Sequence, residues 1–320
     1  MTVAPPLRSG AVPRPSIILD CDPGHDDAMA IILAARHADL LGITTVNGNA
    51  PLARTTANAL VMTQLLGIDT PVHSGAYRPL LAPLLHAEYI HGESGLDGAT
   101  LPPLTRTAAS DDAVGFIIET VRTHEGAWLV PVGPCTNVAL ALRAAPDLAG
   151  RLAGISIMGG SSTFGNRTPA AEFNIWCDPE AAAVVFESGV PIIMSGLNLT
   201  YQAQATPPRI QAIRDLGTPL GTIVADLLVF FTGTYQHVNH GFMGAPVHDA
   251  CAVLALTHPE LFTRRDVHVD VEVHGTHTRG MTLVDNRPIR ERDPDNAVLQ
   301  ETVDADAMFA ILTETIKSFA

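Results

Sequence analysis

Positive charge, aromatic residues and long apolar runs are all scarce in this sequence. Lys317 is its single lysine, and 19 Lys and Arg residues stand against 33 Asp and Glu, which gives a net charge of −14. A chain this acidic is not expected to bind nucleic acid or an anionic membrane. No apolar run approaches the roughly 20 residues that cross a bilayer, so the sequence does not predict a membrane-spanning helix.

The cysteines do not have the spacing of a zinc site. They lie far apart, at Cys21, Cys135, Cys177 and Cys251. We interpret them as small buried residues in a reducing compartment, which predicts a cytoplasmic protein. Residues 1–15 contain four prolines and lack the apolar core of a signal peptide. We therefore expect residues 1–15 to be a disordered lead-in and residues 16–320 to form a single domain.

Short apolar runs alternate with helical patterns along most of the chain. The predicted strands are 17–19, 41–46, 71–73, 128–132, 154–158 and 191–194. This alternation predicts an α/β fold, Rossmann-like, with a mainly parallel central sheet and helices on both faces. Paired strands at 267–273 and 280–284 and a last helix at 304–318 are expected to follow. In such sheets ligands bind beyond the carboxyl ends of the strands.

Four carboxylates follow the first predicted strand within eight residues. They belong to the run Asp20-Cys-Asp-Pro-Gly-His-Asp-Asp-Ala28, which places Asp20 and Asp22 before a turn and Asp26 and Asp27 on the first turn of a helix. Helix capping explains one or two such acids. Four acids in one crevice would raise each other's pKa, and a divalent cation with a preference for oxygen ligands relieves this repulsion. The run therefore predicts a Ca²⁺ or Mg²⁺ site.

The same run, Asp20 to Ala28, resembles the signature of the nucleoside hydrolases, the inosine-uridine preferring nucleoside N-ribohydrolase family. The resemblance extends from about Ser16 to the C-terminus and includes the loop Met158-Gly-Gly…Gly165-Asn-Arg…Ala171-Glu-Phe-Asn174, which is similar to the family's ribose-binding segment. It implies the nucleoside hydrolase fold and the hydrolysis of ribonucleosides to free base and ribose. It also implies a homodimer or homotetramer.

The resemblance assigns roles to individual residues. It implies that Ca²⁺ is bound by Asp22, Asp27, the main-chain carbonyl of Thr136, and Asp249. It implies contacts with the substrate from Asp26, Asn49, Met158, Asn166, Glu172, Asn174, His91 and Tyr235. Asn49 would also position the attacking water. The expected reaction is attack of a Ca²⁺-bound water on C1′ of the ribose, with Asp22 as general base and His248 as the candidate acid for the leaving base.

Each of these residues also has a simpler interpretation. Asn49 is a common turn residue, Glu172 can be a solvated loop charge, and Thr136 and Asp249 can cap helices. His91 can be a surface histidine, His248 can be structural and Tyr235 can belong to the core. Their joint occurrence at strand ends, in the family's order, favours the functional interpretation.

Two other functions are compatible with parts of the sequence. A strand followed by Asp-x-Asp also resembles Mg²⁺ phosphohydrolases, but these need a cation for the phosphate, and the only lysine lies at the C-terminus. A non-catalytic ribose- or nucleoside-binding protein would not need a metal that activates water. The sequence leaves open whether purine or pyrimidine ribonucleosides are preferred, because the irregular segments 75–98 and 235–246 are expected to contact the base.

Overall fold

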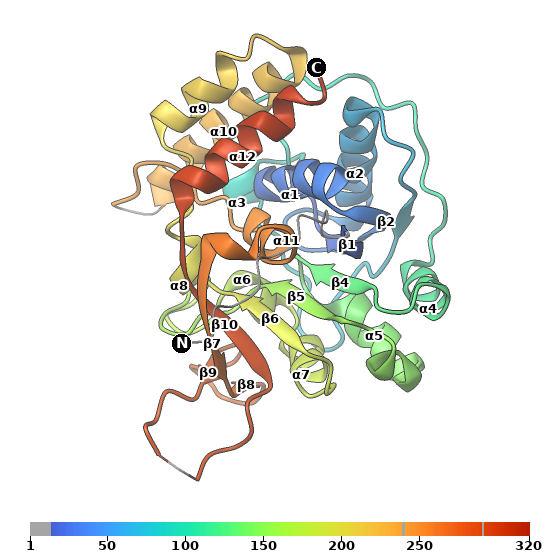
Figure 1. The fold of residues 1–320 in the computed structure, drawn as a ribbon, viewed down its shortest axis with the longest axis vertical. Coiled ribbons are helices and arrows are strands. Elements are labelled where there is room, and N and C mark those ends of the chain that lie inside the picture. The colour runs from blue at the N-terminus through green and yellow to red at the C-terminus, as the bar shows by residue number, and fades with distance from the viewer. Residues whose placement is uncertain (1–13, 239–240, 290) are drawn as a thin grey trace, which may run out of the picture.

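A computed structural model describes residues 14–238, 241–289 and 291–320 (Figure 1). Eight strands form one sheet in the order β3-β2-β1-β4-β5-β6-β10-β7. All neighbouring strands are parallel except β10 and β7. Two further strands, β8 and β9, form a separate antiparallel pair. The α/β class with a mainly parallel sheet is therefore confirmed.

The strand bounds are β1 (Ser16–Cys21), β2 (Asp39–Thr45), β3 (Val72–Ser74), β4 (Trp128–Pro131), β5 (Gly154–Met158), β6 (Ile192–Ser195), β7 (Phe262–Val267), β8 (Val269–Val271), β9 (Thr282–Val284) and β10 (Ala297–Val303). The central strands are short aliphatic runs, and Ile17, Ile18 and Leu19 of β1 are fully buried. Strands of this kind are typical of parallel sheets, because helices cover both of their faces.

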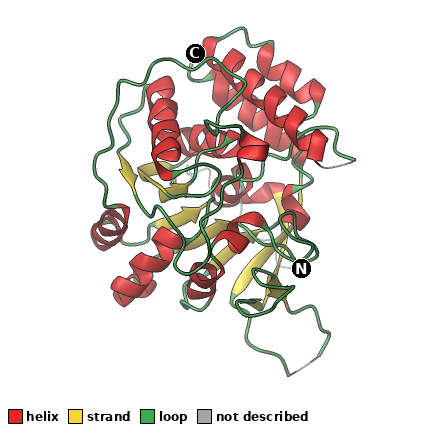
Figure 2. Ribbon diagram, turned by 180° about the vertical axis from the view of Figure 1, so that it is seen from behind, coloured by secondary structure: helices red, strands yellow, loops and turns green. Residues whose placement is uncertain are grey.

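Helices pack on both faces of the sheet, as Figures 1 and 2 show. One apolar cluster joins α1, α2, α10, α11 and α12, and a second cluster on the other face joins α4, α5 and α7. The helix bounds are α1 (His25–His37), α2 (Leu52–Leu66), α3 (Glu88–His91), α4 (Ala113–Thr123), α5 (Thr136–Ala144), α6 (Phe173–Cys177), α7 (Pro179–Phe186), α8 (Leu197–Thr200), α9 (Pro207–Arg214), α10 (Pro219–Val238), α11 (Ala250–Thr257) and α12 (Ala305–Lys317), with short 3₁₀ helices at Pro146–Gly150 and Pro259–Leu261.

The strand order reverses between β1 and β4. From β1 the chain builds the sheet outwards through β2 and β3, and it then returns to add β4 on the opposite side of β1. Ligands of open α/β sheets bind at such a reversal, in the crevice beyond the carboxyl ends of the strands. The segments that follow β1, β2, β4 and β5 carry most of the predicted site residues, so the topology brings these residues to one edge.

The sequence predicted some of the fold correctly and missed other elements. The paired strands near 267–284 are present as β8 and β9, and the last helix is α12. The sequence did not predict β10, which inserts between β6 and β7, nor the one-turn helix α3 within segment 75–98. Residues 1–13, most of the predicted disordered lead-in, lie outside the described residues. Within the described part of the chain, no helix is long and apolar enough to cross a membrane.

Candidate active site

Three buried carboxylates come together where α1 and α11 begin. Asp26 and Asp27 lie on the first turn of α1, and Asp249 immediately precedes α11. One ligand oxygen from each of the three lies within 4.8 Å of the others. The main-chain N–H groups of Asp22 and Gly24 donate to the two oxygens of Asp27, at 3.1 and 2.9 Å. These bonds fix the Asp27 carboxylate at the end of β1.

Asp22 lies beside this group, between the loops that follow β2 and β4. Its Oδ2 accepts the main-chain N–H of Asn49 at 2.6 Å. A Cβ added to Gly48 would lie 2.0 Å from Oδ2, and one added to Gly133 would lie 2.4 Å from Oδ1. Both positions therefore require glycine, because any side chain would displace the Asp22 carboxylate.

The charges of this cluster are only partly compensated within the described residues. Burial, and then the neighbouring carboxylates, raise the pKa of Asp22, Asp26 and Asp249 well above the usual value, and burial also raises the pKa of Asp27. Oδ1 of Asp22 and Oδ1 of Asp26 are buried without a hydrogen-bond partner. Buried carboxylates of this kind are normally paired or coordinate a metal. Since all the donors are oxygens, the cluster fits a hard divalent cation.

Asp20 is not part of the cluster, although the sequence grouped it with the other three acids. Its Oδ1 accepts hydrogen bonds from Thr44 Oγ1 at 2.6 Å and from Asn137 Nδ2 at 2.8 Å. Burial raises its pKa to about 7, and these two bonds oppose the rise. Asp20 thus joins β1 to β2 and α5 behind the site.

The simpler interpretations of four residues can be compared with the contacts they make. Asp249 occupies a helix-capping position but its side chain makes no capping hydrogen bond. Thr136 is the first residue of α5, and its hydroxyl donates to Asp178 at 2.6 Å. Asn49 donates through Nδ2 to the main-chain oxygen of Asp22 at 3.2 Å and to Asp27 Oδ2 at 3.1 Å. His91 is buried rather than on the surface. The simple cap, turn and surface interpretations therefore do not describe these four side chains.

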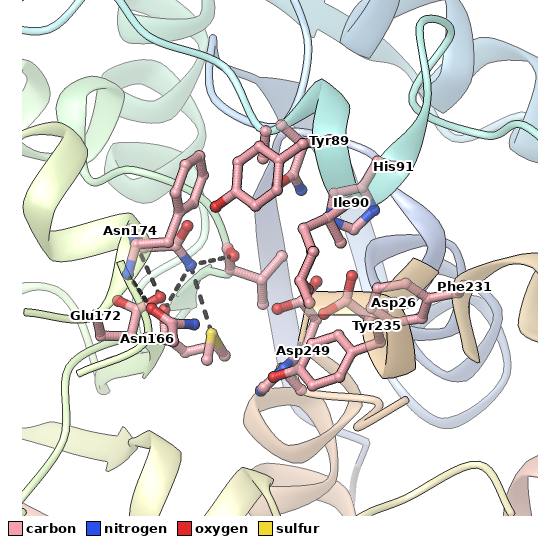
Figure 3. A pocket seen from close by; sticks show the side chains of 17 residues that line it. Asp26, Tyr89, Ile90, His91, Asn166, Glu172, Asn174, Phe231, Tyr235 and Asp249 are labelled. Carbon is pink, nitrogen blue, oxygen red and sulfur yellow. Dashed lines mark hydrogen bonds between the residues drawn. The ribbon is translucent and has the colours of Figure 1, made fainter. Parts of the chain in front are cut away.

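A cavity opens beside the carboxylates (Figure 3). Figure 3 shows Asn166, Glu172 and Asn174 on one side of it and Ile90, His91, Phe231 and Tyr235 on the other. Asp26, Asn49, Met158, His248 and Asp249 also line it. The structure thus brings together all the predicted site residues that were expected to touch substrate. Asp22, Asp27 and Thr136 do not line the cavity.

Asn174 and Met158 connect two strand ends at the cavity. Asn174 Nδ2 donates to the main-chain oxygens of Val132, after β4, and of Met158, at the end of β5, at 2.8 and 3.1 Å. Asn166 is exposed, and its Oδ1 accepts the N–H of Phe173 at 2.9 Å. Hydrogen bonds with the main chain therefore hold the amide group of Asn174 in the wall of the cavity and that of Asn166 at its rim.

Glu172 is buried and holds its own loop in place. Its carboxylate accepts main-chain N–H bonds from Gly160 at 2.9 Å, Asn174 at 2.9 Å and Ile175 at 3.1 Å. Burial raises its pKa to about 7, although the main-chain donors oppose this. Glu172 is thus the N-terminal cap of α6 and joins that helix to the end of β5, whereas the sequence had left open a solvated charge.

The other wall is aromatic and contains two histidines. Tyr235 packs edge-on against Phe231 with ring centroids 5.8 Å apart, and Oγ1 of Thr200 lies 2.7 Å from Nδ1 of His248. Burial lowers the pKa of His248 to about 3 and that of His91 well below the usual value. Both imidazoles are therefore neutral near pH 7.

Several cavity residues were missed by the sequence reasoning. They are Ala87, Tyr89, Ile90, Val132, Phe173, Phe231 and Val238. Most are apolar, and an apolar residue carries no chemical signal of its own. The one available indication was position, because Tyr89 and Ile90 precede His91 in the irregular segment 75–98.

Comparison with known proteins identifies the class of enzyme that this fold and site define. The chain is 45% identical over 308 residues to the pyrimidine-specific ribonucleoside hydrolase RihA of Escherichia coli O7:K1, covering 95% of this chain and 99% of that protein. The RihA of Shigella boydii serotype 4 is 44% identical over the same length and coverage. The solved purine-preferring ribonucleoside hydrolase from Gardnerella vaginalis superposes with a TM-score of 0.88 at 32% identity, covering 95% of this chain and 98% of that one. These relatives are ribonucleoside hydrolases, and the solved one has the same α/β fold.

Residues 17–310 match the model of the inosine-uridine preferring nucleoside hydrolase family. The chain belongs to this family and is a nucleoside N-ribohydrolase, which cleaves the N-glycosidic bond of ribonucleosides. The sequence also left open two other classes of protein, a phosphohydrolase and a non-catalytic binding protein. The phosphohydrolase would need a cation for the phosphate, and no Lys or Arg is among the described residues that line the cavity.

The role of Glu172 in holding its loop can be tested by measuring the stability of a variant. Replacing Glu172 with Ala leaves buried main-chain N–H groups without acceptors, at a cost of about 1–3 kcal/mol in the free energy of unfolding. Urea denaturation measures this loss, and hydrogen exchange should accelerate at the amides of Gly160, Asn174 and Ile175. Glu187→Ala, at an exposed position, is the control. Unchanged exchange at the three amides would show that the bonds do not hold the loop.

Proposed function

We propose that this enzyme hydrolyses pyrimidine ribonucleosides in a Ca²⁺-dependent reaction, with the cation bound by Asp22, Asp27, Asp249 and the main-chain carbonyl of Thr136. The observation that carries the proposal is the buried carboxylate group, whose Asp26 and Asp249 also line the cavity. The preference for pyrimidines is supported by the relatives of 44–45% identity, which are described as pyrimidine-specific. The purine-preferring enzyme of known structure is more distant, at 32% identity.

A cation held by Asp22, Asp27, Asp249 and the Thr136 carbonyl would lower the pKa of a nearby water and would attract the ribose hydroxyls. Asp22 accepts a proton from the attacking water as general base, and the Asn49 side chain orients that water. Asp26 and Asp27 are adjacent on α1 and face different directions. We assign Asp26 to the ribose because it lines the cavity and its Oδ1 has no partner among the described residues. Asp27 lies behind the cavity and binds the ion.

The remaining walls divide between the sugar and the base. Asn166, Glu172, Asn174 and Met158 hold the ribose, and the negative charge around it stabilises the positive charge that develops on the sugar. His91 and Tyr235 contact the base. His248 is the candidate acid for the leaving base, and the Thr200 contact at Nδ1 leaves Nε2 for the base. Because burial keeps His248 neutral near pH 7, it has to take up a proton before it can give one to the base, and negative charge that develops on the base favours this uptake by raising the pKa of His248. The homo-oligomeric state and the cytoplasmic location stay predictions.

The base preference is tested by a panel of uridine, cytidine, inosine and adenosine, assayed for ribose release. We expect kcat/KM for the two pyrimidine ribosides to exceed that for the purine ribosides by about tenfold or more, a typical discrimination by pocket shape. Equal or faster cleavage of inosine would contradict the pyrimidine assignment and leave the class of enzyme untouched.

The cation is tested by its removal. Prolonged chelation should abolish ribose release. Added Ca²⁺ should restore it, because the positive charge of the ion again compensates the buried carboxylates. Asp22→Asn and Asp249→Asn should each lose most of the activity and weaken Ca²⁺ binding in calorimetry. Asp147→Asn is the matched control, since Asp147 forms a surface ion pair with Arg122. Full activity after chelation, with no calcium detected in the protein, would refute calcium dependence.

The role of His248 is tested by changing the leaving group. General acid catalysis contributes roughly 10²–10⁴-fold and matters only when the departing group needs a proton. His248→Ala should lose about that factor on uridine and retain most activity on p-nitrophenyl riboside, whose leaving group departs as an anion. Equal losses on both substrates would indicate a damaged metal site instead of a missing acid.

A further inference from the structure

His25 lies inside the acidic signature run, and the reaction described above gives it no task. It is the first residue of α1, its ring is fully buried, and it does not line the cavity. The ring stacks on Phe230 and Phe231 of α10 at centroid distances of 5.4 and 5.2 Å, and on His91 at 5.3 Å. His25 therefore lies between the carboxylate run, α10 and the segment that carries His91.

Both ring nitrogens of His25 have a polar atom within hydrogen-bond distance. Nε2 lies 2.9 Å from the main-chain oxygen of Asp97, and Nδ1 lies 3.1 Å from Nδ1 of His91. A carbonyl oxygen can only accept, so Nε2 of His25 carries a hydrogen. The main-chain N–H of His25 also lies 3.3 Å from Nδ1 of His91. Nδ1 of His91 either accepts this N–H or donates its own hydrogen to Nδ1 of His25, but not both, because a neutral His25 with its hydrogen on Nε2 has none on Nδ1. Two contacts from one residue thus converge on a single nitrogen of His91.

These contacts leave one nitrogen of His91 for the substrate. Nε2 of His91 makes no hydrogen bond to the described residues, and His91 lines the cavity. His91 ends the one-turn helix α3, which is too short to hold a ring in place by itself. Gly24 permits the close approach, because a Cβ there would lie 2.6 Å from Nδ1 of His91. The orientation of the His91 ring therefore depends on Gly24 and His25 of the signature run.

We propose that His25 is a positioning residue that fixes the ring of His91 so that Nε2 of His91 meets the base of the substrate. This inference rests on the proposed function, in which His91 contacts the base. It couples the run that binds the cation to the residue that contacts the leaving base. If the residues of the signature run moved, the contact between His91 and the base would therefore move as well.

The segment itself has an independent anchor, so that removal of the His25 hydrogen bonds need not release it. Asn58 Nδ2 donates to the main-chain oxygens of Pro23, in the signature run, and of Ser94, at 2.9 and 2.8 Å. Substitutions of His25 can therefore test the orientation of the His91 ring separately from the order of the segment.

Two substitutions separate the two hydrogen bonds of His25. The amide of asparagine occupies the place of Nδ1, so His25→Asn keeps a partner for His91. The amide of glutamine reaches the place of Nε2, so His25→Gln keeps a partner for the Asp97 carbonyl. His25→Phe keeps only the stacking on α10. If His25 were merely structural, the phenylalanine variant would retain activity.

The experiment measures kcat and KM of the Ca²⁺-loaded enzyme for uridine and for p-nitrophenyl riboside. We expect His91→Ala, His25→Gln and His25→Phe each to lose about tenfold or more in kcat/KM on uridine, and much less on p-nitrophenyl riboside. His25→Asn should recover most of the loss. The double variant His25→Gln/His91→Ala should be no worse than His91→Ala alone, because the two residues act as one unit.

Three results would overturn the proposal. They are unchanged uridine kinetics of His25→Gln, additive losses in the double variant, and equal losses on both substrates with weakened Ca²⁺ binding, which would place the effect at the neighbouring carboxylates. If His91→Ala loses kcat/KM on uridine and His25→Gln does not, the role of His25 is refuted and the base contact of His91 stands. No loss in His91→Ala would refute the base contact of His91 in the proposed function, and the inference would fall with it.

Discussion

The crowding of carboxylates at the carboxyl edge of the sheet is the constraint on which the site depends. Asp22, Asp26, Asp27 and Asp249 are buried within one group of elements, where desolvation and mutual repulsion both oppose ionisation. The compensation among the described residues is partial, and consists of the main-chain N–H groups and the Asn49 amide that donate to Asp22 and Asp27. An arrangement this unfavourable is maintained because a cation can occupy it.

Much of the surrounding chain serves to bring these carboxylates together. The reversal of strand order beside β1 places the loops after β2 and β4 against Asp22, and only glycine at positions 48 and 133 leaves room for its side chain. On the sugar side, Asn174 joins the ends of β4 and β5 and Glu172 caps α6. On the base side, the pair His25 and His91 extends the signature run into segment 75–98. The proposed cation, sugar and base sites thus lie together at the carboxyl edge of the sheet.

The sequence predicted the parallel sheet and the position of the acids, because apolar runs and clustered carboxylates have strong local signals. It did not predict β10, whose sequence Ala-Val-Leu-Gln-Glu-Thr-Val has only a short apolar start. It grouped Asp20 with the other acids, since spacing along a chain does not show that Asp20 turns towards Thr44 and Asn137. It had no means of finding Phe231, because an apolar residue in a pocket looks like one in a core. Likewise, His25 gave no signal, since its role depends on a partner 66 residues away.

The central claim is that the buried carboxylates hold a calcium ion beside the proposed ribose site. Crystals of the enzyme grown with calcium and ribose, measured at a wavelength where calcium scatters anomalously, test it most directly. The account predicts one anomalous peak bounded by Asp22, Asp27 and Asp249, with ribose hydroxyls in contact with it. Crystals saturated with calcium that show ribose in the cavity and no peak between these carboxylates would contradict the account.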